Sequence, residues 1–75
     1  MISYGEYIAA IGKSIHALRA ERGLSLRALG MMVGVHYNQI LKIEQGVANP
    51  SIRTLYRIAE GLEVEIEDLL PKRMN

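Results

Sequence analysis

The most restrictive feature of the sequence is residues 24–46, LSLRALGMMVGVHYNQILKIEQG, which contain two short amphipathic segments separated by a glycine. Ser25 can cap a helix over residues 26–33, because a serine oxygen at the N-cap accepts the first free backbone N–H groups. Gly34 can take the left-handed conformation that ends such a helix. A second helix is predicted over residues 37–45, so the stretch predicts two short helices joined by a tight turn.

Apolar spacing in both segments supports this geometry, because each set falls on one face of a 3.6-residue helix. The buried set comprises Leu26, Leu29 and Val33, then Ile40 and Ile43, with Val35 filling the gap between the helices. The opposite side of the second helix is mostly polar: Tyr37, Asn38, Gln39, Leu41, Lys42 and Gln45. Asparagine, glutamine and lysine match base edges in the major groove, where the second helix of a helix-turn-helix lies. The stretch therefore indicates DNA binding, and a solvated helix face is the alternative for any one of these residues alone.

Size and composition limit the remaining possibilities. The 75 residues suffice for one domain, spanning residues 1–75, with a modest core. The chain has no cysteine, which excludes disulfides, thiolate metal sites and thiol nucleophiles. No apolar run approaches the roughly 20 residues that span a bilayer, and the N-terminus lacks the features of a signal peptide. We therefore expect a cytoplasmic protein that does not enter a membrane.

Charge is distributed unevenly along the chain. Residues 1–59 carry seven Lys or Arg and three Glu, whereas residues 60–75 carry two basic and five acidic residues. A basic body with an acidic C-terminal segment is consistent with a polyanion partner on one side of the molecule. Ordinary surface charge is the alternative.

A first helix is predicted to begin near Tyr4, because Ser3 and Glu6 have the spacing of a capping box. Its buried stripe follows helical spacing: Ile8, Ile11, Ile15 and Leu18. Gly23 is expected to end this helix, and Gly12 to permit close approach of another one.

A fourth helix is predicted after Pro50, with Ser51 as its cap and Gly61 as its end. Its expected buried face is Ile52, Leu55, Ile58, Ala59 and Leu62. A last helical turn, IEDLL, follows over residues 66–70. Five helices and no convincing strand make the predicted fold class all-α.

Three segments in register resemble the phage-repressor and Cro-like helix-turn-helix family, also called the xenobiotic-response-element family. They are LRAERGLS, IEQGVANPS and LYRIAEGLEV…DLL, and the similarity is strongest over residues 11–70. The resemblance implies a compact five-helix domain of the lambda-repressor-like type, with the helix-turn-helix at its second and third helices. It also implies a prokaryotic or phage-encoded transcription regulator that binds operator DNA as a homodimer, without a cofactor.

The resemblance also assigns site residues. The positions that read bases correspond to Tyr37, Asn38, Gln39 and Lys42. The positions that contact phosphate correspond to Arg27, His36, Gln45 and Asn49. An ion pair common in the family corresponds to Arg19 and Glu44, for which two unpaired surface charges are the alternative.

This chain departs from the family pattern at three positions in and around the helix-turn-helix. Leu26 replaces a glutamine that contacts phosphate and braces the third helix. Gly30 replaces a small alanine, and His36 replaces the serine or threonine that caps the third helix. These departures concern the phosphate contacts rather than the fold.

Metal binding and catalysis receive little support from the sequence. His16 and His36 lie on different predicted elements and make a poor zinc set without cysteine. Ser14, Ser25 and Ser51 occupy helix-cap or helix-surface positions rather than a nucleophile–base arrangement. We therefore predict no metal site and no enzymatic activity.

The C-terminal segment is the predicted dimer interface. Ile66, Leu69 and Leu70 cannot all face one core from a single helical turn, so we expect Leu69 to point inward and Ile66 and Leu70 to meet a second copy. A two-fold dimer predicts a palindromic operator. We expect a small autoregulatory repressor or controller protein, and the alternative is an antitoxin or protein-binding helical module whose partner is a toxin or another protein.

Overall fold

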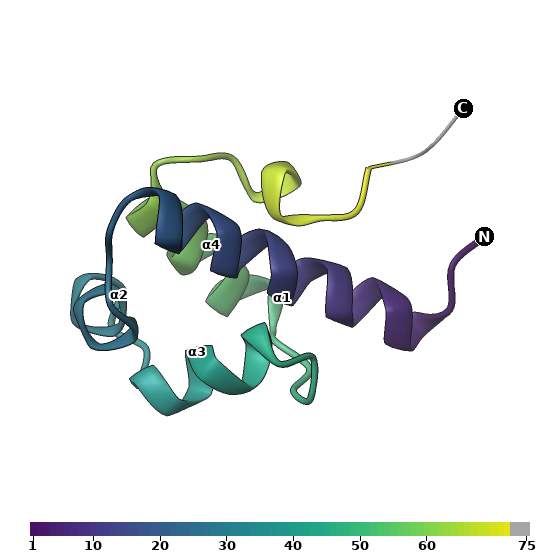
Figure 1. The fold of residues 1–75 in the computed structure, drawn as a ribbon, viewed down its shortest axis with the longest axis horizontal. Coiled ribbons are helices and arrows are strands. Elements are labelled where there is room, and N and C mark those ends of the chain that lie inside the picture. Colours follow the sequence, from purple (N-terminus) through teal and green to yellow (C-terminus); the bar gives the residue numbers. More distant parts are fainter. Residues whose placement is uncertain (73–75) are drawn as a thin grey trace.

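The computed structural model describes residues 1–72, and all regular elements in this part of the chain are helices, without a strand. Its elements, in order, are α1 (Tyr4–Glu21), α2 (Leu26–Val33), α3 (Tyr37–Glu44), α4 (Ile52–Leu62) and the 3₁₀ helix η1 (Ile66–Leu69) (Figure 1). The predicted all-α fold is confirmed. The fifth predicted helix is this short 3₁₀ helix, so the described residues hold four α-helices rather than five.

Local caps define where the helices begin. Ser3 Oγ accepts a hydrogen bond from the Glu6 backbone N–H at 3.1 Å, and Glu6 Oε1 accepts one from the Ser3 N–H at 3.0 Å. Ser25 accepts the N–H of the residue three positions on at 3.0 Å, and Ser51 does the same at 3.1 Å. Each bond satisfies a backbone donor that has no partner within the helix. The predicted starts of α1, α2 and α4 are therefore confirmed.

The predicted end of α4 is wrong. Gly61 lies inside the helix, and Glu63 takes the left-handed conformation at its end, with φ of 60°. A Cβ on Gly61 would overlap Val33 Cγ1 and lie 3.2 Å from Leu29 Cδ1. This glycine therefore permits α4 to pack closely on α2 and does not serve as a helix stop.

One predicted core residue is also misplaced. Ile52 is 73% exposed, because it is the first residue of α4 and lies before the helix meets the core. The buried face of α4 is Leu55, Ile58, Ala59 and Leu62.

The core gathers residues from all five elements. The side chains with almost no exposure are Ile15, Leu29, Ile40, Ile43, Ile58, Leu62 and Leu69. Figure 1 shows α3 lying beside α1, and at Gly12 the two backbones are in close contact. A Cβ on Gly12 would overlap the carbonyl oxygen of Ile43 and lie 2.6 Å from that of Glu44. The predicted close approach at Gly12 is thus confirmed, and it determines how α3 is held.

The C-terminal segment returns along α1, and η1 packs against both α1 and α4. Leu69 is fully buried, as expected. Ile66 and Leu70 are half-buried and pack against the core, so they present less surface to a partner than the sequence suggests. Among residues 1–72, the structure contains no helix long and apolar enough to cross a membrane.

Candidate nucleic-acid interface

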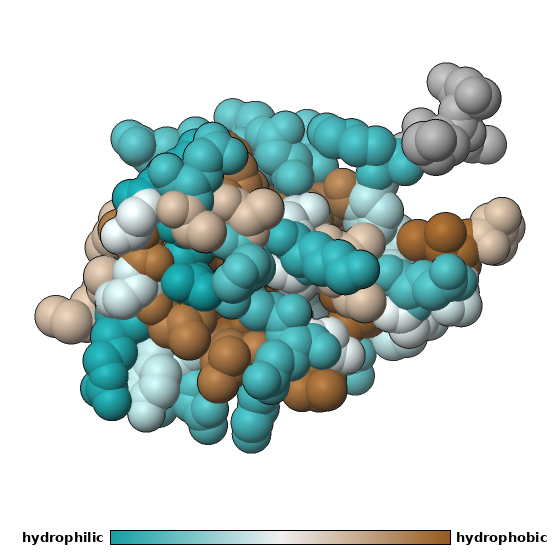
Figure 2. Space-filling view, in the orientation of Figure 1, coloured by the Kyte–Doolittle hydropathy of each residue, from teal (hydrophilic) through white to brown (hydrophobic). Residues whose placement is uncertain are grey.

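Helix α3 presents one polar side to solvent. Ile40 and Ile43 are fully buried, which fixes the rotation of the helix about its axis. The exposed side carries Asn38, Gln39, Lys42 and Gln45. Hydrophilic side chains project along the edge of the molecule where α3 lies (Figure 2). The structure therefore brings three of the four predicted base-reading residues together on one exposed face.

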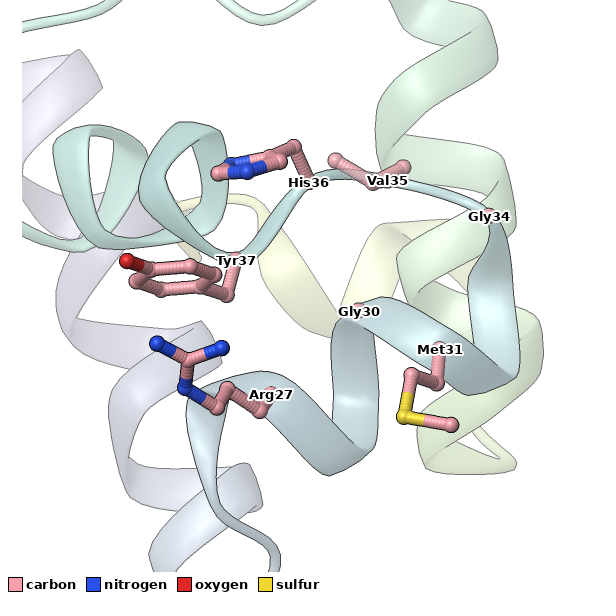
Figure 3. A pocket seen from close by; sticks show the side chains of 7 residues that line it. All are labelled: Arg27, Gly30, Met31, Gly34, Val35, His36 and Tyr37. Atoms are coloured by element: carbon pink, nitrogen blue, oxygen red, sulfur yellow. The ribbon is translucent and has the colours of Figure 1, made fainter.

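The fourth of these residues, Tyr37, has a different environment. Its side chain is half-buried at the start of α3. The Arg27 guanidinium lies over the Tyr37 ring, 4.2 Å from the centroid. The His36 ring stacks on the same ring with centroids 4.7 Å apart and an interplanar angle of 29°. Figure 3 shows the Tyr37 ring between these two groups, so the phosphate-contact candidates Arg27 and His36 form one cluster with it.

His36 caps α3. Its Nδ1 accepts a hydrogen bond from the Asn38 backbone N–H at 3.1 Å, in the role of the serine or threonine typical of the position. A neutral imidazole that accepts at Nδ1 carries its proton on Nε2. The exposed ring therefore keeps its Nε2–H free to donate a hydrogen bond, for example to a phosphate oxygen.

Gly30 explains how the turn approaches α2. A Cβ on this residue would lie 2.5 Å from the Val35 carbonyl oxygen and 3.2 Å from the Tyr37 backbone nitrogen. The Gly30 carbonyl also accepts the N–H groups of Gly34 and Val35, at 2.9 and 3.1 Å. The turn thus packs directly on the α2 backbone, and this chain uses glycine where an alanine methyl would collide.

Asn49, a predicted phosphate contact in the loop after α3, is held by a residue that sequence reasoning missed. The Tyr4 hydroxyl donates to Asn49 Oδ1 at 2.8 Å. This leaves the Asn49 NH₂ group as a hydrogen-bond donor. No sequence pattern links these two residues, because they lie 45 positions apart and meet only when α1 packs beside the loop.

Arg19 and Glu44 form a bidentate ion pair between α1 and the end of α3. Arg19 Nε and Nη2 donate to Glu44 Oε2 and Oε1 at 2.7 and 2.9 Å, and Arg19 Nη1 donates to the Leu24 carbonyl at 2.9 Å. The side chains are only 13% and 5% exposed. His16, whose role was also missed, places Nδ1 3.0 Å from Glu44 Oε1. The network anchors the C-terminal end of α3 to α1.

The Glu44 carboxyl titrates below its ordinary value. Burial alone would raise its pKa, but hydrogen bonds and charges from Arg19 and His16 outweigh burial and lower that pKa below 4.5. The Glu44 bond likewise raises the pKa of the Arg19 guanidinium.

Acid should weaken the fold through this pair. Because the Glu44 pKa is lower in the folded protein than in the unfolded chain, its contribution is complete above the ordinary value of 4.5 and is lost as the pH falls through the lower folded value. We expect the free energy of unfolding, measured by urea titration, to decrease between about pH 5 and pH 3. The double variant Arg19→Met/Glu44→Leu should show a shallower decrease, and an unchanged slope would contradict this assignment. The double variant retains the Glu6 contribution, since bonds from Ser3 lower the pKa of that carboxyl as well.

Helix α3 packs against the short helix α2 through a tight turn, and its buried face leaves its polar side exposed. This arrangement defines a helix-turn-helix domain. Among known families, the helix-turn-helix model of Cro/C1 type matches residues 15–69. The chain therefore belongs to this family of DNA-binding transcriptional regulators.

Relatives agree with this assignment. The chain is 38% identical over 60 residues to the transcriptional regulator SlrR of Bacillus subtilis, a match covering 79% of this chain and 40% of SlrR. It is 40% identical over 55 residues to a helix-turn-helix-type transcriptional regulator of Archaeoglobus fulgidus, covering 73% and 79% of the two chains. The chain thus spans less than half the length of SlrR and most of the length of the archaeal regulator.

Solved structures show the same fold. SinR, described as the master regulator for biofilm formation, has been solved in complex with DNA, with 35% identity, a TM-score of 0.75, and coverage of 79% of this chain and 95% of that one. SinR has also been solved in a complex with the SinI protein, with 35% identity, a TM-score of 0.78, and coverage of 83% and 61%.

Proposed function

We propose that this chain is a sequence-specific regulator that reads duplex DNA with α3 in the major groove. The observation that carries the proposal is the exposed polar side of α3, flanked at its start by the Arg27–Tyr37–His36 cluster. Asn38 and Gln39 can pair with adenine edges, and Lys42 with guanine. The complex of SinR with DNA supports this role, since SinR shares both the fold and 35% identity.

Phosphate contacts complete the proposed interface. Arg27 lies on α2, the helix that crosses the DNA backbone in this motif. His36 offers its Nε2–H, Asn49 its NH₂ group, and Gln45 an exposed amide beyond the other end of α3. Such contacts position the protein on the duplex, while the groove-facing side chains provide sequence discrimination.

Removing the central polar side chains should weaken sequence-specific binding. Asn38→Ala combined with Lys42→Ala should weaken binding to a duplex selected from a random pool by about 1–3 kcal/mol, roughly 5- to 150-fold. Both side chains are exposed, so the fold should be retained. Electrophoretic mobility shift measures the effect, and circular dichroism verifies folding.

A matched control separates this effect from loss of charge. Arg57→Ala removes one positive charge from α4, where the arginine lies near Glu60 and Glu63. It should leave binding nearly unchanged at moderate salt. Full affinity in the folded double variant would disprove the proposed reading helix.

We also propose that the protein acts as a homodimer through its C-terminal segment and binds a palindromic operator, as a small autoregulatory repressor or controller. Ile66 and Leu70 remain the proposed contacts, although each is half-covered by its own core. Exposed Ile2 and Tyr4 add apolar surface near the C-terminal segment, where residues from the two ends of the described chain line a hollow. Two-fold pairing would place the recognition helices about 34 Å apart, one turn of DNA.

Sedimentation equilibrium tests the dimer. We expect a dimeric mass at tens of micromolar protein. Leu70→Asp should give a monomeric mass, because burying an unpaired carboxylate in an apolar interface is costly. Circular dichroism of this variant excludes simple unfolding. A monomeric wild type, or a folded Leu70→Asp dimer, would place the interface elsewhere or remove it.

A protein partner is the second candidate function. Ile52 and Tyr56, one helical turn apart on α4, are 73% and 56% exposed, and SinR has been solved with SinI as its partner. A protein-binding module or antitoxin would use such apolar surface. Salt discriminates the two functions, because DNA binding through phosphates weakens steeply with salt and an apolar interface does not.

A further inference from the structure

The cluster at the α2–α3 junction gives Tyr37 a surrounding unlike that of a base-reading residue. One face of its ring is covered by the Arg27 guanidinium at 4.2 Å, and the other is stacked by His36 at 4.7 Å. Figure 3 shows this arrangement in the free protein. Since both ring faces are occupied, the ring cannot stack on a base, and only its edge and hydroxyl remain accessible.

We propose that Tyr37 is a positioning residue, which holds Arg27 in the orientation that contacts a DNA phosphate. This inference rests on the proposed function. Tyr37 then does not read a base but aligns Arg27 of the neighbouring helix α2. The starts of α2 and α3 together form one phosphate-binding unit.

The chemistry of arginine favours this role. A guanidinium group stacks through its planar face, whereas its N–H donors lie in the plane at its edge. Stacking on Tyr37 therefore leaves the donors available for a phosphate oxygen. An exposed arginine otherwise samples many rotamers, and ordering it on binding opposes the interaction. A side chain already held in place by cation–π attraction loses less freedom.

His36 supports the arrangement from the other side. Its Nδ1 is committed to the Asn38 N–H at 3.1 Å, which fixes the imidazole beside the Tyr37 ring. Gly30 lets the Tyr37 backbone approach α2, since a methyl there would lie 3.2 Å from the Tyr37 nitrogen. Backbone contacts thus fix the His36 cap and the start of α3, and the Tyr37 ring in turn meets the Arg27 guanidinium.

The first test uses the free protein. Ring currents should move the NMR signals of the Arg27 side-chain protons upfield in the wild type and in Tyr37→Phe, which retains the ring. Tyr37→Leu should return them to ordinary values while circular dichroism remains unchanged. Ordinary shifts in the wild type would overturn the proposal, whatever the DNA result.

The second test is a double-mutant cycle on a duplex selected from a random pool, with a scrambled duplex for comparison. Tyr37→Leu should weaken binding to both duplexes by about two- to fivefold, the size expected of an exposed cation–π contact. It should cause no further loss in an Arg27→Ala background. Tyr37→Phe should bind as the wild type does. Arg27→Ala should reduce the slope of log affinity against log salt concentration by about one, the amount expected for one lost phosphate contact.

The contrary outcomes are distinct. A change of sequence preference in Tyr37→Phe, or losses from Tyr37→Leu and Arg27→Ala that multiply, would make Tyr37 a base reader and overturn the positioning role. Upfield Arg27 signals in a wild type that binds neither duplex would overturn the proposed DNA-binding function, and the phosphate role of the pair with it.

Discussion

Gly12→Ala should destabilise the protein by about 3 kcal/mol or more, although alanine is the better helix former. The added methyl would overlap the Ile43 carbonyl oxygen and lie 2.6 Å from the Glu44 carbonyl. These are backbone atoms of α3, so a rotamer change cannot relieve the collision and the helix itself must move. Total stability for a chain of this size is roughly 4–11 kcal/mol. Urea unfolding should therefore show a large decrease in midpoint.

Gly5→Ala is the matched control, because it makes the same substitution in the same helix. A Cβ at Gly5 meets only Ser3 Oγ, at 4.0 Å. This variant should stabilise the protein by about 0.5–1 kcal/mol through helix propensity alone. Equal effects at the two glycines would mean that α1 and α3 are farther apart than the structure places them.

Glu44→Ala should be the second severe substitution, with a loss of about 3–5 kcal/mol. The Arg19 guanidinium, 13% exposed, would lose both of its bonds to the carboxylate and keep as partners only the Leu24 carbonyl and His16 Nδ1, neither of which carries a negative charge. A nearly buried charge without its counter-ion is costly, whereas the intact pair need not be strongly stabilising. Thermal and urea unfolding near pH 7 measure the loss.

Two comparisons isolate the ion pair. Glu21→Ala removes a carboxylate that is 73% exposed and 3.9 Å from Arg22, and should cost less than about 1 kcal/mol. Arg19→Met/Glu44→Leu removes both charges and should be more stable than Glu44→Ala alone. A small effect of Glu44→Ala would show that Arg19 turns to solvent without penalty.

Helix starts were predictable because the interactions that define them are local. Ser3, Ser25 and Ser51 each bond to an N–H three residues on, so the cap and its target are adjacent in the sequence. The bounds predicted for α2 agree with the structure residue by residue. The same locality explains the left-handed Gly34, and the polar side of α3 followed from its buried spacing.

Long-range packing produced the errors. Gly12 and Gly61 look alike in the sequence, yet one was predicted to pack and the other to end a helix. Both lie at helix crossings, and Glu63 takes the left-handed position instead. Which glycine meets another helix depends on where the helices cross, and residue spacing within one helix does not determine that.

The sequence by itself determined the helices, their N-terminal caps, the buried face of α3 and the membership of the family, since periodicity and capping act within a few residues. Only the tertiary structure decided that Arg27 and His36 enclose the Tyr37 ring, that Tyr4 holds Asn49, and that His16 joins the Arg19–Glu44 pair. These contacts join side chains from different helices or turns. Their geometry follows from how the core packs, because the buried side chains set the distance and rotation between helices.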